Sequence, residues 1–309
     1  MGFVNLSQAQ LFLADTLRAD PVKVELIGEG AWSRCFGFQR GEQELVIRFG
    51  NHKDDFEKDQ MAHAFGAPGL PIPEVLEIGS AFDGYYAIST RARGIPLEEV
   101  RADQWPALVP ALVCALEAMR VADVSTIRGY GGWGREAEAS HTCWSEHLLA
   151  IGDDAPDART HGWRKRLASS AEGETTFTWG FDLLKRIVGD SAPRSLLHCD
   201  LINRNVLVDA DRISAVFDWG CSRCGDHLYD LAWFEFWAPW HLNLNVGLLR
   251  AALEQRWREV GHTPENLEPR LMACHLHIGL DHLAYNAYRG DWETLSATAQ
   301  RMRTLAAGD

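Results

Sequence analysis

The chain lacks the features that mark membrane-spanning and exported proteins. Among its 309 residues no apolar run approaches the roughly 20 residues that a membrane helix needs, and the best, residues 107–119, is interrupted by Pro110. The first ten residues have neither the basic start nor the apolar centre of a signal peptide. Leu6 stands where a myristoylation motif requires Ser or Thr. These absences predict a cytoplasmic protein.

Cysteine is too sparse and irregular to form a framework. The seven cysteines are an odd number scattered over the chain, which indicates reduced thiols. Cys221 and Cys224 have the spacing of half a zinc or redox motif, but no second Cys-x-x-Cys supplies the other ligands of a structural zinc. We therefore expect neither a disulfide scaffold nor a zinc site.

Positively charged residues are also few in this chain. Thirty Lys and Arg residues face 43 Asp and Glu residues, which leaves a net charge of −13, and only five of the basic residues are lysines. This balance disfavours nucleic acids and anionic membranes as partners and suits a cationic ligand better. We expect no nucleic-acid or membrane partner, and a monomer.

The pattern of apolar residues changes character near residue 93. Before it, an amphipathic helix capped by Ser7, with Leu11, Leu13 and Leu17 as its apolar members, precedes strand-like runs. We expect strands at 22–27, 33–38, 44–49, 75–78 and 85–90, with a helix at 53–65. After it, helical spacing predicts helices at 104–121, 142–150, 176–188, 226–237, 242–260 and 269–288, and the glycines of 129–134 predict a surface loop. The chain therefore reads as an α+β protein with a β-rich lobe over 1–93 and a mainly helical lobe over 94–309.

One β-hairpin interrupts the helical part, and polar residues gather at its open end. The runs 206–208 and 213–217 flank a polar turn, so Asn205 and Asp218 lie at the same end of the pair. Asp200, five residues before Asn205, can curl over the same point. Two carboxylates and an amide suit a hard cation such as Mg²⁺, which prefers phosphate oxygens as further ligands. The segment predicts a nucleotide kinase or phosphatase; the alternative is a hairpin with polar caps.

The spacing of these residues resembles a known family. His198-Cys199-Asp200-x4-Asn205, followed by Asp218-Trp219, is similar to the His-Gly-Asp-x4-Asn and Asp-Trp motifs of the aminoglycoside phosphotransferases, which are small kinase-like enzymes. The family's next elements, Gly-Asp and Asp-Leu-Ala, match 225–226 and 230–232. Further stretches resemble the branch that acts on hygromycin B: 70–76, 129–131, Trp144, 236–240 and 278–281. The resemblance implies a two-lobed protein-kinase-like fold that binds nucleotide in its sheet lobe and aminoglycoside in its helical lobe.

The resemblance also implies roles for the residues of the motif. Asp200 would be the catalytic base, and Asn205 and Asp218 would hold Mg²⁺ on the phosphates of ATP or GTP. His198 is expected to be a scaffold residue of the loop. We expect Asp226 to cap a helix and Asp230 to brace the catalytic loop.

The candidate nucleotide site lies in the sheet lobe. Gly28, Gly30 and Ser33 belong to a segment that resembles a kinase glycine-rich loop without its third glycine, and Arg48 stands where protein kinases have a lysine. Two glycines in a turn are also explained by backbone conformation alone. Glu57 and Asp59 are both candidate partners of Arg48. The adenine would meet backbone groups of Ser89, Thr90, Arg91 and Ala92.

The candidate substrate residues lie in the helical lobe. Trp237 and Trp240 flank a proline near the end of a helix, where indole faces can stack on sugars and attract ammonium groups, whereas Trp233 is assigned to the core. Glu235 and Asp281 would supply acids for amines, and Asn203 would contact a hydroxyl. Their alternatives are core aromatics, solvated acids and a loop-stabilising amide.

Together the residues and the resemblance predict an ATP- and Mg²⁺-dependent O-phosphotransferase. Its substrate would be a cationic aminoglycoside or aminocyclitol antibiotic, with hygromycin B as the first choice, and its activity would confer resistance. The alternatives are a kinase of another small alcohol, such as choline, homoserine or a macrolide, and a catalytically silent nucleotide-binding module. The joint presence of Asp200, Asn205 and Asp218 argues against the silent module.

Overall fold

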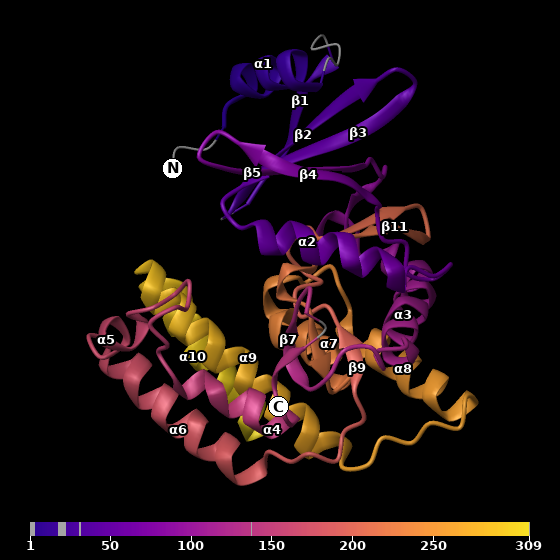
Figure 1. Cartoon of the computed structure of the whole chain (residues 1–309). Coiled ribbons are helices and arrows are strands. Elements are labelled where there is room, and N and C mark those ends of the chain that lie inside the picture. Colours follow the sequence, from indigo (N-terminus) through magenta and orange to yellow (C-terminus); the bar gives the residue numbers. More distant parts are fainter. Residues whose placement is uncertain (1–3, 18–22, 31, 137, 309) are drawn as a thin grey trace.

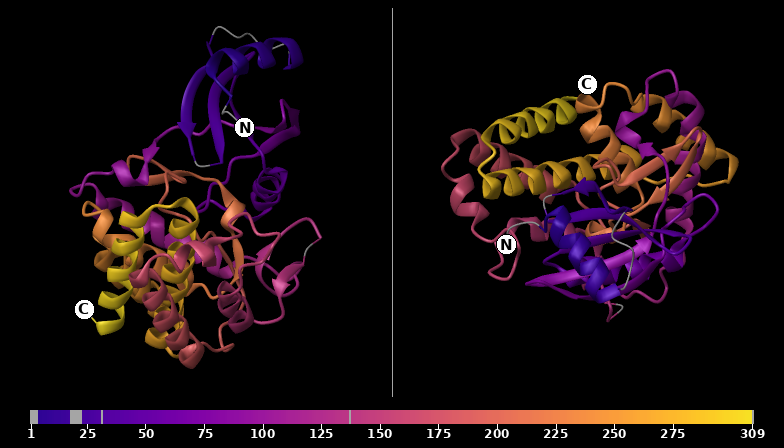
Figure 2. Two further views of the ribbon diagram at one scale, coloured as in Figure 1. Left: turned by 90° about the vertical axis from the view of Figure 1, so that its left-hand side faces the viewer. Right: turned by 90° about the horizontal axis from the view of Figure 1, so that it is seen from above.

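The chain folds into a sheet lobe and a larger helical lobe. The computed structural model describes residues 4–17, 23–30, 32–136 and 138–308. Figure 1 shows the sheet lobe above the helical lobe, and Figure 2 shows the same division from two further directions. Val22, in the first expected strand, and Ala31, in the glycine-rich segment, lie outside the described residues. The predicted α+β architecture with two lobes is confirmed.

An antiparallel sheet forms the first lobe, with the strand order β1-β2-β3-β5-β4. Its strands are β1 (Glu25–Glu29), β2 (Ser33–Arg40), β3 (Gln43–Gly50), β4 (Val75–Ala81) and β5 (Gly84–Thr90). The five predicted strands are confirmed, although β1 begins and ends later than expected. The central strand β3 pairs with both β2 and β5. As in any pleated strand, its successive residues point to opposite faces of the sheet.

Helix α1 (Leu6–Leu17) covers one of these faces. Ala9 and Leu13 are buried in the same cluster as Phe36 and Ile47 of the sheet. Leu11, named from the sequence as an apolar member of this helix, is 64% exposed, because it lies off the stripe formed by Ala9 and Leu13.

The predicted cap of α1 is also corrected. Asn5, not Ser7, caps the helix: its Oδ1 accepts the Gln8 N–H at 2.9 Å, and Gln8 Oε1 accepts the Asn5 N–H at 2.9 Å. This reciprocal pair satisfies two N–H groups that the first helical turn leaves without helical partners.

Helix α2 (Lys53–Ala62) covers the opposite face and lies between the sheet and the helical lobe (Figure 1). It continues as the 3-10 turn η2 (His63–Phe65), so the helix predicted over 53–65 is confirmed. Phe56 is buried against Val75 and Ala87 of the sheet. Because one side of α2 is fixed to the sheet, its other side is free to contact the second lobe.

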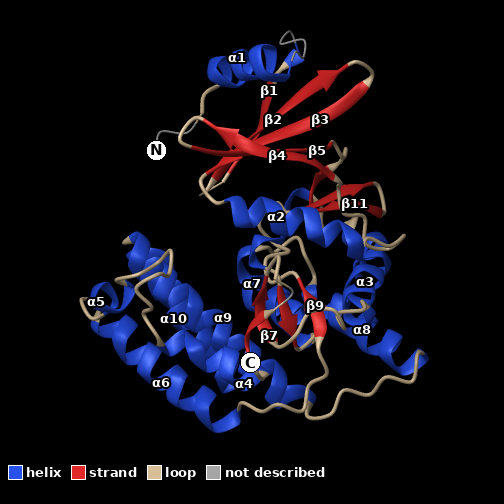
Figure 3. Cartoon of the chain, in the orientation of Figure 1, coloured by secondary structure: helices blue, strands red, loops and turns tan. Residues whose placement is uncertain are grey.

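Helices dominate the second lobe, as Figure 3 shows. They are α3 (Trp105–Val121), α4 (Trp144–Leu149), α5 (Trp163–Leu167), α6 (Ala171–Ile187), α7 (Leu228–Trp237), α8 (Val246–Glu259), α9 (Leu267–Arg289) and α10 (Trp292–Ala307). The six predicted helices are present, but α5 and α10 were not predicted. None of the helices in the described ranges is both long and apolar enough to cross a membrane.

Capping residues explain where two helices depart from the predicted bounds. Ser170 Oγ accepts the Gly173 N–H at 3.1 Å, so α6 begins at Ala171, five residues before the predicted start. Asn245 Oδ1 accepts the Leu248 N–H at 3.0 Å, so α8 begins at Val246, four residues after the predicted start. In both cases a local polar side chain, and not apolar spacing, fixes the first turn.

Two small sheets complete the helical lobe. The predicted hairpin is β10 (Val206–Asp209) with β11 (Arg212–Val216), and β6 (Ile95–Pro96) joins it. The second sheet, in the order β8-β7-β12-β9, was not predicted. Its strands are β7 (Tyr130–Trp133), β8 (Ala139–His141), β9 (Ser195–Leu197) and β12 (Arg223–Gly225). Strand β7 replaces most of the surface loop predicted over 129–134.

The chain passes between the lobes just after β5. This strand ends at Thr90, whereas β6 begins at Ile95 and pairs with β10 of the second lobe. Gly94 has a φ of +141°, and a Cβ there would lie 2.6 Å from the Val208 carbonyl oxygen, so the crossing requires glycine. We retain the division between residues 93 and 94 as a proposal.

Buried histidines of the helical lobe make a prediction about acid stability. His277, 2% exposed, lies 2.9 Å through Nδ1 from the Tyr229 hydroxyl, and burial lowers its pKa to about 3. Between the unfolded pKa of about 6.5 and the folded value, the unfolded chain binds the proton and the folded one does not, so acidification removes stability.

We expect the free energy of unfolding of wild-type protein to lose about 1 kcal/mol more than that of a His277→Gln variant between pH 7.5 and 5.5. Urea unfolding of both proteins at both pH values measures this difference. Because each protein is compared with itself, the variant's loss of the Tyr229 contact cancels. Equal pH dependence would show that His277 does not titrate in this way.

Candidate active site

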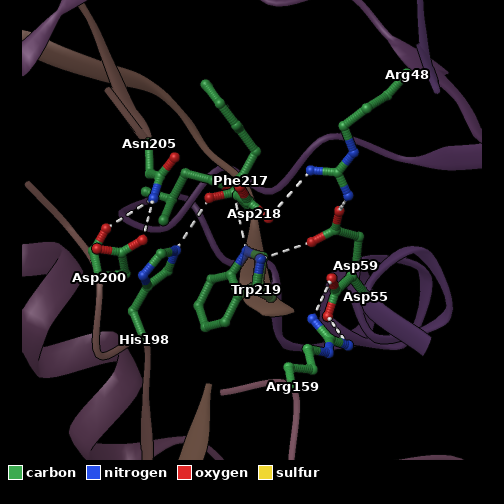
Figure 4. Close-up of polar contacts among 11 residues, drawn as sticks. Arg48, Asp55, Asp59, Arg159, His198, Asp200, Asn205, Phe217, Asp218 and Trp219 are labelled. Atoms are coloured by element: carbon green, nitrogen blue, oxygen red, sulfur yellow. Dashed lines mark hydrogen bonds and ion pairs between the residues drawn. The ribbon is translucent and has the colours of Figure 1, made fainter. Parts of the chain in front are cut away.

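The open end of the β10–β11 hairpin brings the predicted catalytic and metal-binding residues together (Figure 4). Val206 pairs with Val216, and the Phe217 N–H donates to the Asn205 carbonyl at 3.0 Å, so Asn205 and Asp218 flank the end of the ladder. Asn205 Nδ2 donates to the Asp200 carbonyl at 2.8 Å and to Asp200 Oδ2 at 3.0 Å. The convergence inferred from spacing is therefore present in the fold.

Asp230 holds the catalytic loop from below. Its two carboxylate oxygens accept the N–H groups of His198 at 2.9 Å and Cys199 at 2.7 Å. Cys199 has a φ of +66°, a left-handed conformation that a residue with a side chain adopts only when its surroundings enforce it. Burial raises the pKa of Asp230 to about 6, against the lowering effect of the two N–H groups. These contacts match the bracing role expected of Asp230.

His198 joins the catalytic loop to the segment that carries Asp218. Its Nε2 lies 3.0 Å from the Phe217 carbonyl, and its ring packs 4.7 Å from the Trp219 ring, centroid to centroid. The residue is fully buried, and burial lowers its pKa to about 4. A buried, neutral histidine bonded to a carbonyl matches the scaffold role expected of it.

Asp200 is held by two amides. Asn203 Nδ2 donates to Asp200 Oδ1, while Asn205 Nδ2 donates to Oδ2. Burial raises the pKa of Asp200 well above its ordinary value, although these hydrogen bonds act in the opposite direction. Asn203 itself is exposed, so it lies at the surface of the site beside the carboxylate.

Asp218 occupies the left-handed region, with a φ of +63°, and its side chain is 44% exposed. Arg48 Nη1 lies 3.1 Å from Asp218 Oδ1, and Arg48 Nη2 forms an ion pair with Asp59. Of the two candidate partners of Arg48 on helix α2, Asp59 is therefore the one that forms the ion pair. Glu57 instead pairs with Lys53 at 2.9 Å and with Arg135 at 3.5 Å.

The donor set at this end of the hairpin fits Mg²⁺. Because Asn205 Nδ2 is committed to Asp200, the amide is oriented with Oδ1 as its unused oxygen (Figure 4). Asp218 offers a half-exposed carboxylate. A carboxylate and an amide oxygen, with room for water and phosphate oxygens, are the ligands that Mg²⁺ prefers.

The glycine-rich segment fits a phosphate-bearing ligand. Gly30 N–H donates to the Ser33 carbonyl at 2.9 Å, which closes the turn between β1 and β2. Neither Gly28 nor Gly30 has a positive φ, and a Cβ at either would meet no described atom nearer than 3.9 Å. Neither backbone strain nor packing therefore demands glycine, and the missing Cβ leaves the backbone of the turn open to approach by a ligand.

In the segment expected to bind adenine, some of the backbone N–H groups already donate hydrogen bonds within the lobe. Thr90 N–H donates to the Glu74 carbonyl at 3.0 Å, and Arg91 N–H donates to the Glu44 carbonyl at 3.2 Å. The Arg91 guanidinium also pairs with Glu25 of β1 at 2.7 Å. The N–H groups of these two residues are used within the lobe. Ser89 lies within β5, paired with Val46 of β3 and Val75 of β4, so Ala92, which follows Arg91, remains the candidate.

The predicted substrate residues separate into two groups. Asp281, on α9, is half-buried and takes part in none of the ion pairs among the described residues. Glu235 is engaged elsewhere, with Arg250 at 3.1 Å and His275 Nε2 at 2.9 Å. Its carboxylate is thus neutralised within the protein, which weakens its case as a substrate acid.

The aromatic candidates form one cluster at the end of α7. The Trp237 ring packs 5.2 Å from Trp240 and 4.6 Å from His282, centroid to centroid, while Trp240, in the 3-10 turn η6 (Ala238–Trp240), is 42% exposed. Trp233 is buried, in agreement with its assignment to the core. Trp240 is therefore the more accessible of the two predicted faces.

Two residues that the sequence did not single out contact the site from other elements. Lys58 of α2 donates to carbonyls of the segment after Asp218. Arg159 lies 2.8 Å from Asp55 and 2.5 Å from Asp54, both on α2, which ties the helical lobe to the sheet lobe. Figure 4 shows the contact with Asp55. No local motif marks either residue; for Lys58 the signal was its rarity, as one of five lysines.

The zinc alternative finds no support. Both Cys221 and Cys224 are free thiols, and the parts of the chain that the structure describes hold no group of three or more His, Cys, Asp or Glu suited to a metal.

Comparison with known proteins decides the family. The model of the phosphotransferase enzyme family APH matches residues 23–263, well over half of the chain. The chain belongs to this family. The family resemblance drawn from the motifs and the prediction of a phosphotransferase are thereby confirmed.

Individual relatives extend the match over nearly the whole chain. The hygromycin-B 4-O-kinase of Escherichia coli is 32% identical over 272 residues, which cover 86% of this chain and 75% of that protein. A crystal structure of aminoglycoside phosphotransferase APH(4)-Ia is 28% identical with a TM-score of 0.84, covering 99% of this chain and 100% of the other. A thermostable mutant of APH(4)-Ia, in a ternary complex with AMP-PNP and hygromycin B, is 29% identical with a TM-score of 0.82, covering 97% and 99%. The predicted kinase-like fold is confirmed.

Proposed function

We propose that this family member transfers the γ-phosphoryl group of ATP to a hydroxyl of hygromycin B or a close aminocyclitol relative. The observation that carries the proposal is the convergence of Asp200, Asn205 and Asp218 at one hairpin end, with Arg48 above them. The relatives support the acceptor, because one is named a hygromycin-B kinase and another binds hygromycin B with AMP-PNP.

Asp200 acts as the base in this proposal. Its carboxylate orients the acceptor hydroxyl for in-line attack and takes its proton as the oxygen–phosphorus bond forms and the bond to ADP breaks. The amides of Asn203 and Asn205 fix the carboxylate in one orientation, so little reorganisation is needed when the acceptor binds.

Asn205 Oδ1 and Asp218 would hold Mg²⁺. The ion would neutralise charge on the phosphates when bound. Arg48 is positioned by Asp59 so that its guanidinium faces the same space, and it would contact the phosphates directly. The glycine-rich turn at Gly28 and Gly30 would let backbone N–H groups approach the nucleotide.

Charge and aromatic faces would select the acceptor. The protein's net charge of −13 attracts a polycation, and Asp281, which is half-buried and takes part in none of the ion pairs among the described residues, would meet an ammonium group. Trp240 offers an exposed indole face to a sugar ring, and Asn203 an amide beside the base. Because Glu235 is paired with Arg250, it would contribute to acceptor binding only indirectly, by stabilising the position of helix α7.

A coupled assay of ADP release across a panel of aminoglycosides and small alcohols tests the proposal. Release that requires Mg²⁺ and hygromycin B supports it. Release driven by choline, homoserine or a macrolide, but not by aminoglycosides, would assign a different small-alcohol kinase. Nucleotide binding without turnover of any acceptor would indicate a silent module.

Expression in a sensitive bacterium tests the choice of antibiotic. We expect tolerance to hygromycin B to rise and tolerance to kanamycin to stay unchanged, because acids around a cleft suit one arrangement of amines. Tolerance to kanamycin alone would contradict the hygromycin assignment but leave a kinase of aminoglycosides in place.

Replacement of Trp240 tests the predicted sugar contact. Since Trp240 is exposed, a Trp240→Ala variant should keep its fold, and we expect the KM of the acceptor to rise about tenfold, the equivalent of about 1.4 kcal/mol. The KM of the nucleotide serves as the internal control and should change less than twofold. Equal changes in both constants would remove Trp240 from the acceptor site.

A further inference from the structure

Lys58 is a buried lysine whose ammonium contacts carbonyls and an aromatic ring. Its Nζ donates to the Gly220 carbonyl at 3.0 Å and to the Ser222 carbonyl at 3.0 Å, and lies 5.5 Å from the centroid of the Trp133 ring. The residue is 9% exposed. The neighbouring acids of α2 pair with other cations, and none of the ion pairs among the described residues includes Lys58.

Burying an ammonium group without a carboxylate partner costs free energy. An ammonium taken out of water without a carboxylate partner loses most of its hydration, and burial lowers the pKa of Lys58. An apolar side chain of similar length would avoid that cost. The value of Lys58 is therefore sought in what its hydrogen bonds hold in place.

The hydrogen bonds made by Lys58 and its neighbour on α2 hold the segment that follows Asp218. The Trp219 N–H donates to Asp59 Oδ1 at 2.6 Å, and the carbonyls of Gly220 and Ser222 accept from Lys58. Two consecutive residues of α2 thus bind three of the four residues after Asp218. Asp218 itself is left-handed, a conformation that persists when surrounding contacts determine it from several sides.

We propose that Lys58 is a positioning residue, which fixes the segment 219–222 and so aims the Asp218 carboxylate at the magnesium site; this inference rests on the proposed function. Because α2 is packed on the sheet of one lobe and the segment belongs to the other, the same contacts link the relative position of the lobes to the metal site. Lys58 does not touch the reacting atoms.

The test compares magnesium-dependent nucleotide binding in two lysine variants of one helix. Lys58→Met removes the ammonium and keeps an unbranched apolar chain. Lys53→Met is the matched control, because Lys53 lies at the start of α2, is 46% exposed and, among the described residues, has Glu57 as its one ion-pair partner. Calorimetric titration with AMP-PNP, in Mg²⁺ and in EDTA, gives the factor by which Mg²⁺ enhances affinity.

We expect Lys58→Met to reduce this enhancement by about 10- to 100-fold, the usual effect of changing a group that supports a metal ligand. kcat should fall with it, the KM of the acceptor should stay within about twofold of wild type, and Lys53→Met should match wild type throughout. A Lys58→Met protein with a lower Tm but an unchanged enhancement and kcat would overturn the inference, since Lys58 would then be only a structural anchor.

A second variant covers the case in which Lys58→Met does not fold. Lys58→Gln keeps an NH₂ group with two N–H donors, but its side chain is one bond shorter and uncharged, so it would reach the two carbonyls less well and we expect it to lose part of the enhancement. Wild-type enhancement in Lys58→Gln would contradict the positioning role. If the wild-type protein itself shows no enhancement by Mg²⁺, the proposed function fails at its metal site, and this inference fails with it.

Discussion

An Asp200→Asn variant is expected to bind the magnesium nucleotide like the wild-type protein and to transfer phosphoryl groups about 100- to 10,000-fold more slowly, the range that a positioned base contributes. The substitution removes the proton acceptor but keeps the shape of the loop. Asn205 still donates to the Asp200 carbonyl, and the exposed Asn203 amide can turn to accept from the new NH₂ group.

Single-turnover assays give the transfer rate, and titration with AMP-PNP in Mg²⁺ gives the affinity. Asp209→Asn, an exposed carboxylate at the far end of the same hairpin, is the matched control and should behave as wild type. If Asp200→Asn retains the wild-type rate, Asp200 is not the base.

The sheet lobe could be predicted well because its signals are local. Alternating apolar residues define β2 to β5, and short turns predict the pairing of β2 with β3 and of β4 with β5. The pairing of β3 with β5 spans α2 and does not follow from a short connection. The second small sheet could not be predicted in this way. Its strands β9 and β12 lie far from β7 and β8 in sequence, and three- or four-residue strands leave too little periodicity to be recognised.

The sequence prediction also missed the ends of some helices, and the whole of helix α10, for a different reason. Polar caps such as Asn245 fix where a helix begins, and apolar spacing alone cannot reveal them. For α10 both signals were present, since Asp291 accepts the Thr294 N–H and Leu295, Ala299 and Met302 are buried at helical spacing. That helix could have been predicted from the sequence.

The candidate site likewise contains contacts that the sequence predicts and contacts that it does not. Spacing along one hairpin was enough to bring Asp200, Asn205 and Asp218 together, because the antiparallel ladder fixes which residues share an end. Spacing could not choose between Glu57 and Asp59 for Arg48, nor anticipate that Arg250 neutralises Glu235, since those contacts join elements whose relative position only the folded chain defines.

An Asp218→Asn variant should lose magnesium-dependent nucleotide binding and phosphoryl transfer together, in contrast to Asp200→Asn. Changes in groups that merely support a ligand cost about 10- to 100-fold in metal affinity, so we expect loss of the ligand's charge to reach or exceed the upper end of that range. Asparagine is preferred to alanine here because Asp218 has a φ of +63°, a conformation that asparagine adopts at lower cost than alanine.

The electrostatics around Asp218 sharpen the expected result. Arg48 lies 3.1 Å from Asp218 and also pairs with Asp59, so in the variant it keeps one carboxylate and remains near the phosphates. Affinity for AMP-PNP in EDTA should therefore stay within about threefold of wild type, an allowance of less than 1 kcal/mol, while the enhancement by Mg²⁺ disappears. Asp211→Asn, exposed in the turn at the opposite end of the hairpin, is the control. Equal loss of affinity with and without Mg²⁺ would mean that Asp218 acts through Arg48, and the metal assignment would then be wrong.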